Sequence, residues 1–405
     1  MTKRLNVLVL TTVFPNSYQP LNGLFVWERL RHLSDGAQLL VLAPVSWRWR
    51  HRITGEETRE GVTVIHPVFL YIPRVLKFAD GVWLFLSCLL PVFKIRRTFE
   101  FELIDAHFAF PEGFAAIALG KVFKVPVTIT LRGNEVEFSR EMGRGWAIRW
   151  ALRRADRVIA VSHELAALAR RSGASEHQIH VVPNGVDGHK FRMEAKDVAR
   201  RALGAHPSEK VIVSVGHLTS RKRFDLLIDA VGLLHEAGVR VHLYVVGGRV
   251  AESGRYPDLL EAQVRDSQLL DVVTLLDAQP PAAIAKWFSA ADISVLVSSR
   301  EGCPNVVLES MSCGCPVVTT AVGEAPEMVP ECAGRVIPAD ISAGQLAAAL
   351  SDALHTEWDR ERIRRYAEGK TWKSVGQDVT RSWHQAVSHH FLTRPQSPVA
   401  PVARR

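Results

Sequence analysis

The sequence predicts an α/β protein built from two doubly wound, Rossmann-like domains. Short β-branched apolar runs alternate with longer stretches of helical spacing, a pattern typical of a mostly parallel sheet covered by helices on both faces. This rhythm breaks at the turn-rich stretch Pro183–Asp187 and then restarts. At 405 residues and 47% hydrophobic composition, the chain can bury two cores of ordinary size. We expect the domains to face a central cleft, with ligands at the carboxyl ends of the strands.

The first domain is predicted to span residues 1–185. Its strands are expected where β-branched apolar runs are bounded by polar or turn-forming residues, and its helices where apolar residues recur at intervals of three and four. The predicted strands are 6–11, 38–43, 62–66, 103–106, 127–131, 158–161 and 179–182, and the predicted helices are 26–33, 114–123, 145–154 and 164–172.

The second domain is predicted to span residues 186–370. A C-terminal helix over residues 371–392 follows it, and we expect a disordered tail over 393–405 because this segment holds three prolines and few large apolar residues. The predicted strands are 211–215, 241–246, 272–275, 293–297 and 316–320; the predicted helices are 224–236, about ten residues from 304, 343–354 and 375–391, and the segment 284–289 is expected to lead into the strand 293–297.

Charge and cysteine usage limit the partners and the compartment. A net charge of +8 and a pI near 9.4 favour an anionic partner, but the basic residues are spread out and no nucleic-acid motif occurs, so we expect an anionic membrane face or a phosphorylated substrate instead of nucleic acid. The five cysteines lack paired C-x-x-C spacing, which predicts reduced thiols and no metal site. The first ten residues lack the apolar core of a signal peptide, so a cytoplasmic protein is predicted.

Two segments are candidates for contact with the inner face of the cell membrane. The apolar run Val82–Leu90 is shorter than the roughly 20 residues that span a bilayer, and it is either a buried helix or an interfacial helix whose basic end, Lys94–Arg97, meets lipid headgroups. The loop Trp47–Arg52 combines Trp with Arg, which suits a membrane interface or a phosphate-bearing acceptor. An ordinary solvated loop is the alternative.

The stretch Ser298–Pro316 carries the strongest functional pattern. Pro304 is predicted at the first helical position, and Gly314 marks the end of that helix. The first-turn N–H groups of such a helix lack partners within the helix and attract anions. Glu301 and Glu309 flank this anion site, so two carboxylates lie next to a place suited to phosphate.

The amino-acid sequence of this stretch resembles the E-x7-E signature of the retaining glycosyltransferases of family four. It reads E-G-C-P-N-V-V-L-E-S-M-S-C-G-C-P-V-V. Cys303 replaces the usual aromatic residue, and Ser310 and Ser312 replace two alanines. The resemblance extends from the first strand to about residue 375 and implies the GT-B fold, in which the last helix crosses back to the first domain. The motif sequence is most similar to that of family members assigned to bacterial capsular, teichuronic or exopolysaccharide assembly.

The resemblance implies a donor site in the second domain. Glu309 would hold the ribose hydroxyls, which suits a carboxylate because it can accept two hydrogen bonds from a vicinal diol, and Glu301 would contact the transferred sugar. Pro304 has no N–H, so its neighbours must supply the backbone donors. The donor-binding residues expected from this stretch are Gly302, Cys303, Pro304, Asn305, Val306 and Glu309.

The stretch Ser214–Arg223 resembles the family's strand, V-G-R-L and Lys pattern. Gly216 and Lys222 match it, and Lys222 is predicted to contact the donor diphosphate as a catalytic residue. His217 stands where the family has Arg, and an imidazole supplies less positive charge than a guanidinium. Arg221 or Arg223 is therefore expected to compensate.

The first domain is expected to bind the acceptor. Gly23 resembles the loop glycine that allows the backbone to approach the donor, and His107, just past a strand end, is predicted to face the transferred sugar as a catalytic residue. Arg132-Gly133-Asn134-Glu135 looks like the family's R-G-x-D loop with Glu135 in place of Asp. Arg132, Asn134 and Glu135 are predicted to contact the acceptor or the sugar.

The predicted function is therefore a retaining, metal-independent hexosyltransferase that uses a UDP- or GDP-sugar, needs no cofactor, and acts on a glycan or lipid-linked acceptor. The resemblance implies a front-face displacement, in which the leaving phosphate helps to deprotonate the acceptor. Two alternatives are a nucleotide-sugar epimerase of the same fold and a non-catalytic nucleotide-sugar-binding partner of another transferase, the latter favoured by His217.

Overall fold

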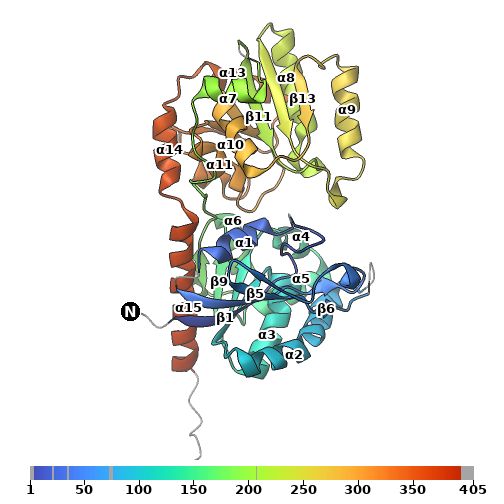
Figure 1. The fold of residues 1–405 in the computed structure, drawn as a ribbon, viewed down its shortest axis with the longest axis vertical. Coiled ribbons are helices and arrows are strands. Elements are labelled where there is room, and N and C mark those ends of the chain that lie inside the picture. The colour runs from blue at the N-terminus through green and yellow to red at the C-terminus, as the bar shows by residue number, and fades with distance from the viewer. Residues whose placement is uncertain (1–3, 21, 34–35, 73–75, 207, 394–405) are drawn as a thin grey trace, which may run out of the picture. The chain divides into compact units, whose positions relative to one another are not determined.

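The computed structural model describes residues 4–20, 22–33, 36–72, 76–206 and 208–393, and these form two compact units. The first unit combines the chain up to Pro183 with the segment from Val375 onward, and the second spans Asn184–Ser374. Each unit is built around its own sheet (Figure 1). The predicted disordered tail lies outside the described residues except for Thr393, which ends the last helix.

The first unit contains an eight-stranded sheet in the order β10-β9-β8-β7-β1-β2-β5-β4. All neighbouring strands are parallel except β4 and β5, and the short strands β3 (Val45–Ser46) and β6 (Val68–Phe69) pair separately. The strands of the main sheet are β1 (Leu5–Leu10), β2 (Ala37–Leu42), β4 (Glu56–Arg59), β5 (Val62–Ile65), β7 (Leu103–His107), β8 (Val127–Leu131), β9 (Arg157–Ala160) and β10 (Ile179–Val181).

Helices cover this sheet, and α2, α3 and α5 lie together on one side of it (Figure 1). Residues of α15 from Val375 onward belong to this unit, and Trp383 of this helix is fully buried. Hydrogen bonds join His180 Nδ1 to Ser382 Oγ at 2.8 Å and His390 Nδ1 to Asp156 Oδ1 at 2.9 Å. The helices are α1 (Leu24–Arg31), α2 (Asp80–Thr98), α3 (Phe114–Phe123), α4 (Glu135–Phe138), α5 (Met142–Leu152), α6 (His163–Arg171) and α15 (Trp372–Thr393), with single turns η1 (Arg50–Arg52), η2 (Lys77–Ala79), η3 (Ala109–Gly113) and η4 (Glu176–Gln178).

The second unit contains a parallel six-stranded sheet in the order β13-β12-β11-β14-β15-β16, with an apolar core on each face. Its strands are β11 (Lys210–Val215), β12 (Val241–Val246), β13 (Val273–Leu276), β14 (Ile293–Leu296), β15 (Val317–Thr320) and β16 (Gly334–Ile337). Its helices are α7 (Lys196–Leu203), α8 (Phe224–Glu236), α9 (Tyr256–Asp266), α10 (Pro281–Ala290), α11 (Asn305–Ser312), α12 (Ala325–Met328), α13 (Ala343–His355) and α14 (Arg360–Glu368), with the turns η5 (Ser220–Lys222) and η6 (Ala251–Ser253).

The strand order reverses at one place in each sheet. In the first unit β1 pairs with both β2 and β7, and in the second unit β11 pairs with both β12 and β14. Such a reversal sends the following connections to opposite faces and opens a crevice at the carboxyl ends of the central strands, where α/β proteins bind ligands. The predicted fold class, two doubly wound α/β domains, is confirmed, and it places a binding position beside β11 and β14.

The predicted bounds agree with the structure for several elements with a strong apolar pattern, whereas other elements are longer than predicted or were not predicted. The bounds of β8, α3, α8 and β12 agree with the prediction. Helix α2 passes through Pro91 and continues to Thr98, beyond the predicted apolar run Val82–Leu90, because the buried side chains Val92 and Ile95 continue the packed face beyond the proline. The sequence did not predict β16, α7, α9 or α14.

Candidate active site

The loop after β14 leads into α11, whose N-terminus is the predicted anion site. The helix has eight residues, and Pro304 is its N-cap at φ −75° and ψ 102°, so the prediction of Pro304 as the first helical residue of a longer helix was wrong by one position. Val307 N–H donates to Pro304 O at 3.1 Å. The N–H groups of Asn305 and Val306 therefore occupy the first-turn positions at which a helix offers donors to an anion.

Glu301, in this loop, is held between two cations. Lys222 Nζ donates to Oε1 at 2.7 Å and Arg221 Nη1 donates to Oε2 at 3.1 Å. Burial by itself would raise the pKa of Glu301, but the charges of Lys222 and Arg221 outweigh burial and lower the pKa below its usual value. The structure thus brings together the two predicted catalytic residues of the second unit, Lys222 and Glu301, as one charged cluster.

The cluster joins the loops that follow two adjacent strands. Lys222 follows β11 and Glu301 follows β14, and the backbone of Ser299 donates to Arg221 O at 2.9 Å. A Cβ added at Gly216 would lie 3.1 Å from Lys222 Cε, so the glycine leaves room for the lysine stem. The predicted donor-binding positions Gly216 and Lys222 therefore lie at the crevice expected from the strand order.

His217 and Arg223 take different roles from the matched lysine. Desolvation, followed by the charge of Lys222, lowers the pKa of His217. Arg223 has a left-handed backbone (φ 53°), and its guanidinium donates to the carbonyls of Ala339 and Ile341. Of the two cations expected to compensate for His217, Arg221 joins the cluster and Arg223 is used to hold a neighbouring loop.

Asn184 is a site residue that the sequence analysis missed. Its side-chain amide donates to Asn305 Oδ1 at 2.8 Å and to Cys303 O at 3.4 Å, and its backbone N–H faces Cys303 Sγ at 3.3 Å. The residue is buried and ties the start of the second unit to the first turn of α11. Pro-Asn-Gly is typical of any turn, so the sequence carried no signal for this contact.

The remaining donor-site residues lie on the same loop and helix. Gly302 O accepts a hydrogen bond from Glu324 N at 3.0 Å, and a Cβ at Gly323 would lie 2.4 Å from that carbonyl, so Gly302 and Gly323 meet backbone to backbone. Glu309 lies on α11 and is half-buried. Cys303 is half-buried as well, and its Sγ lies 3.8 Å from Met328 Sδ.

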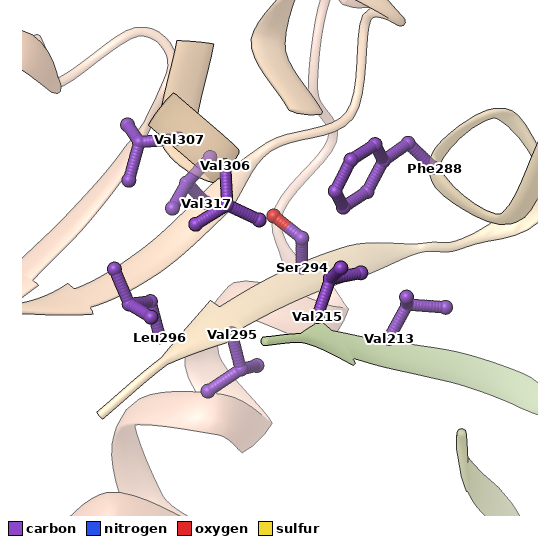
Figure 2. Close-up of a pocket in the computed structure, with 9 residues that line it drawn as sticks. All are labelled: Val213, Val215, Phe288, Ser294, Val295, Leu296, Val306, Val307 and Val317. Atoms are coloured by element: carbon purple, nitrogen blue, oxygen red, sulfur yellow. The ribbon is translucent and has the colours of Figure 1, made fainter. Parts of the chain in front are cut away.

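A small pocket lies inside the second unit, between the sheet and α11 (Figure 2). Ser294 is its only polar lining residue, and its hydroxyl lies 2.6 Å from the hydroxyl of Ser310. An apolar lining offers nothing to a phosphate or a sugar, so this pocket is a packing gap and not the candidate site. Its lining residues are Val213, Val215, Phe288, Ser294, Val295, Leu296, Val306, Val307 and Val317.

In the first unit, His107 ends β7 and is completely buried. Its Nε2–H donates to Asp105 Oδ2 at 3.2 Å, and its Nδ1 accepts a hydrogen bond from Arg132 Nη2 at 3.1 Å. Burial, followed by the charge of Arg132, lowers the pKa of His107 to about 4. In this conformation both ring nitrogens are engaged within the unit, and direct contact of His107 with a sugar stays a prediction.

The predicted acceptor loop is organised by its own glutamate. Glu135 Oε2 accepts from Gly133 N at 2.8 Å and Arg132 N at 3.2 Å, and Oε1 accepts from Ala109 N at 3.0 Å. The carboxylate is buried and binds backbone, which explains the substitution of Glu for the shorter Asp: its oxygens span two loops. Asn134 is the exposed residue of this loop.

Two loop residues of the first unit have structural explanations. Gly23 has φ +70°, and a Cβ there would lie 2.3 Å from Val13 O, so only glycine fits. Glu112, which the sequence analysis missed, is buried and accepts a hydrogen bond from Thr12 N at 3.0 Å; burial raises its pKa to about 7. A carboxylate within the apolar run after His107 was the signal that could have identified it.

The structure also shows the state of the cysteines and whether side chains gather as metal ligands. All five cysteines are free thiols, as predicted. Among the described residues, no group of three or more His, Cys, Asp or Glu side chains is arranged to hold a metal ion. Metal independence of the reaction stays a prediction.

Comparison with known proteins identifies the family. Residues 37–190 match the model of Glycosyltransferase Family 4, and residues 195–370 match the model of Glycosyl transferases group 1. The chain is 28% identical over 338 residues to Bacillus subtilis TuaC, which is named as a teichuronic acid biosynthesis glycosyltransferase; the match covers 79% of this chain and 82% of TuaC. The chain belongs to the family 4 glycosyltransferases.

Solved structures confirm the GT-B fold of this glycosyltransferase. Sucrose-phosphate synthase from Thermosynechococcus elongatus superposes with a TM-score of 0.80 and 21% identity, over 95% of this chain and 100% of that one. Anabaena HepE in complex with UDP-glucose gives a TM-score of 0.74 and 19% identity, over 94% of this chain and 100% of that one. At these identities the likeness concerns the fold alone.

The Asn184 contacts give a first test of how the donor loop is held. We expect Asn184→Ala to lower the free energy of unfolding by about 1–3 kcal/mol, because the buried partners on Cys303 and Asn305 lose a hydrogen bond. Binding of a nucleoside diphosphate, measured by calorimetry, should weaken several-fold as α11 loses its restraint. Gln38→Ala, at an exposed side-chain amide on β2, is the control, and equal affinities for the two variants would contradict this role.

The buried His107 gives a test by pH titration. Because its pKa in the folded enzyme lies below the usual 6.5, the unfolded chain binds the proton more readily. The stability contributed by neutral His107 is complete above pH 6.5 and is lost as the pH falls toward about 4. An NMR titration, with the signal assigned through His107→Gln, should show a midpoint near pH 4, and a midpoint near 6.5 would contradict the buried arrangement.

Proposed function

We propose that this glycosyltransferase is a retaining, metal-independent hexosyltransferase that needs no cofactor. It transfers a hexose from a UDP- or GDP-hexose to a hydroxyl of a glycan or lipid-linked acceptor during surface polysaccharide biosynthesis. The observation that carries the proposal is the cluster of Lys222, Arg221 and Glu301 at the carboxyl ends of β11 and β14. Two cations and the N-terminus of a helix, which attracts anions, lie at the same edge of the sheet. This arrangement suits a nucleoside diphosphate.

The reaction breaks the bond between the anomeric carbon and the diphosphate oxygen and forms a bond from the acceptor oxygen to the same carbon. Negative charge develops on the departing diphosphate, and Lys222, Arg221 and the N–H groups of Asn305 and Val306 stabilise it. In a front-face displacement the acceptor proton passes to the leaving phosphate. Glu309 holds the ribose hydroxyls and Glu301 holds hydroxyls of the hexose.

The charge state of Glu301 supports this division of roles. Its lowered pKa keeps the carboxylate ionised at neutral pH, so it accepts hydrogen bonds and has no proton to donate. In the free protein it is bound to Lys222 and Arg221. Donor binding would redirect these two cations toward the diphosphate and leave the carboxylate to the sugar.

Relatives support the donor class and the pathway. HepE has been crystallised with UDP and with UDP-glucose, which favours a UDP-hexose among the candidates. The name of TuaC concerns teichuronic acid, a surface polysaccharide. We propose that the enzyme acts in the cytoplasm, where its five free thiols remain reduced.

The test uses the full chain with UDP- and GDP-hexoses and a lipid-linked acceptor, following release of the nucleoside diphosphate and the anomeric configuration of the product by NMR. Lys222→Ala and Glu301→Ala should each lower release by a factor on the order of 100 or more, because Lys222 stabilises the charge on the departing diphosphate and Glu301 positions the hexose. Arg201→Ala is the matched control, since it removes an exposed arginine that pairs with Asp197 on α7.

Three outcomes would contradict the proposal. An inverted product would exclude a retaining mechanism. Interconversion of the donor sugar without transfer would indicate an epimerase. Donor binding without release, under every acceptor tried, would indicate a non-catalytic binding partner.

A further inference from the structure

Helix α2 presents an apolar stripe to solvent in the first unit. Val82, Leu86, Leu90 and Phe93 recur at intervals of four, four and three residues and are all exposed, Leu90 by 72%. The segment Lys77–Thr98 is long and apolar enough to cross a membrane by length and composition, yet only 28% of its most apolar window is buried. The opposite side of α2 packs inside the unit through Gly81, Leu84, Cys88, Val92 and Ile95.

Neighbouring elements extend this apolar stripe. Leu70, which is exposed, donates its N–H to Ser87 Oγ on α2 at 3.1 Å. Phe78 packs on the backbone of Gly143, where an added Cβ would lie 2.6 Å from Phe78 Cβ. The same α5 segment carries Met142 and Trp146, exposed by 92% and 57%. The exposed apolar side chains therefore continue from α2 onto both the β6 loop and the start of α5.

The basic loop Trp47–Arg52 adjoins the same face. Trp47 Nε1 donates to Tyr71 O at 3.2 Å, and Tyr71 is the neighbour of Leu70. Arg52 lies over the ring of Trp49, with 5.7 Å between the guanidinium carbon and the ring centroid. The two segments that the sequence marked as candidates for membrane contact, far apart in the chain, are thus joined through Leu70 and Tyr71. The exposed basic residues are Arg48, Arg50, His51 and Arg52 on the loop, and Lys94 and Arg97 on α2.

We propose that this face, the α2 face, docks on an anionic lipid bilayer with α2 lying in the plane of the interface. Apolar and aromatic side chains enter the headgroup boundary while arginine and lysine meet lipid phosphates, the combination by which interfacial helices bind. A membrane-spanning α2 is excluded because one side of the helix is packed inside the unit. Two acidic side chains near this face are paired with cations: Asp80 with Lys77 and Glu141 with Arg144.

Charge favours lipid over a second copy of the chain. A symmetric dimer through the α2 face would bring two basic loops of a protein with net charge +8 toward each other, whereas an anionic bilayer neutralises them. The proposal goes beyond the transfer reaction and does not depend on the identity of the donor. It places the enzyme at the surface where a lipid-linked acceptor is held.

The experiment is sedimentation of the full chain with vesicles containing about 30% phosphatidylglycerol, compared with phosphatidylcholine alone. We expect binding to the anionic vesicles, weakened by salt. Leu86→Glu/Leu90→Glu should lower binding by about tenfold or more, because charge is placed on the inserting stripe. Leu259→Glu/Leu270→Glu is the matched control, at leucines exposed by 59% and 66% in the second unit, and should bind as the wild type.

Further readouts separate the alternatives. Failure of the wild type to bind anionic vesicles, or equal binding by Leu86→Glu/Leu90→Glu, would overturn the proposal. A wild-type dimer that this double variant converts to a monomer, without vesicle binding, would assign the α2 face to a second copy. The double variant should keep wild-type nucleoside diphosphate binding, which also shows that it is folded, so loss of vesicle binding is distinguishable from failure of the proposed transfer function.

Discussion

The ion pair between Lys222 and Glu301 depends on the strand order of the second sheet. Only because β11 is flanked by both β12 and β14 do the loops after β11 and β14 emerge side by side, at the edge where the crossovers diverge. A lysine and a glutamate that are 79 positions apart in the chain then meet at 2.7 Å. The cluster places two cations, Lys222 and Arg221, beside the loop that leads into α11.

Much of the fold was predictable from the sequence, for a definite physical reason. Strand β12 is a mostly apolar run ended by two glycines, and α8 repeats apolar residues with helical spacing, so local sequence alone sets their limits. Where packing decides the limits of an element, the prediction was less accurate: α2 extends through Pro91 past the predicted apolar run, and Pro304 caps α11 without entering it. Short elements such as β16 carry too few residues for a period to be detected.

The sequence predicted which loops form the candidate site, but it did not predict which side chains contact one another there. The motif identified Lys222 and Glu301, but the sequence did not distinguish the roles of Arg221 and Arg223. Arg221 joins the cluster, whereas Arg223 donates to the carbonyls of Ala339 and Ile341. Asn184 was missed because its partners lie more than a hundred residues away. In the first unit, burial separates His107 from solvent, a property that no sequence pattern reports.

The most direct measurement of the central claim is a crystal structure of the full chain soaked with UDP and, separately, with GDP. The account predicts diphosphate density within hydrogen-bonding distance of Lys222 Nζ and of the N–H groups of Asn305 and Val306, with the ribose at Glu309 and the Lys222–Glu301 contact lengthened. Diphosphate bound elsewhere, with the Lys222–Glu301 pair unchanged, would contradict it.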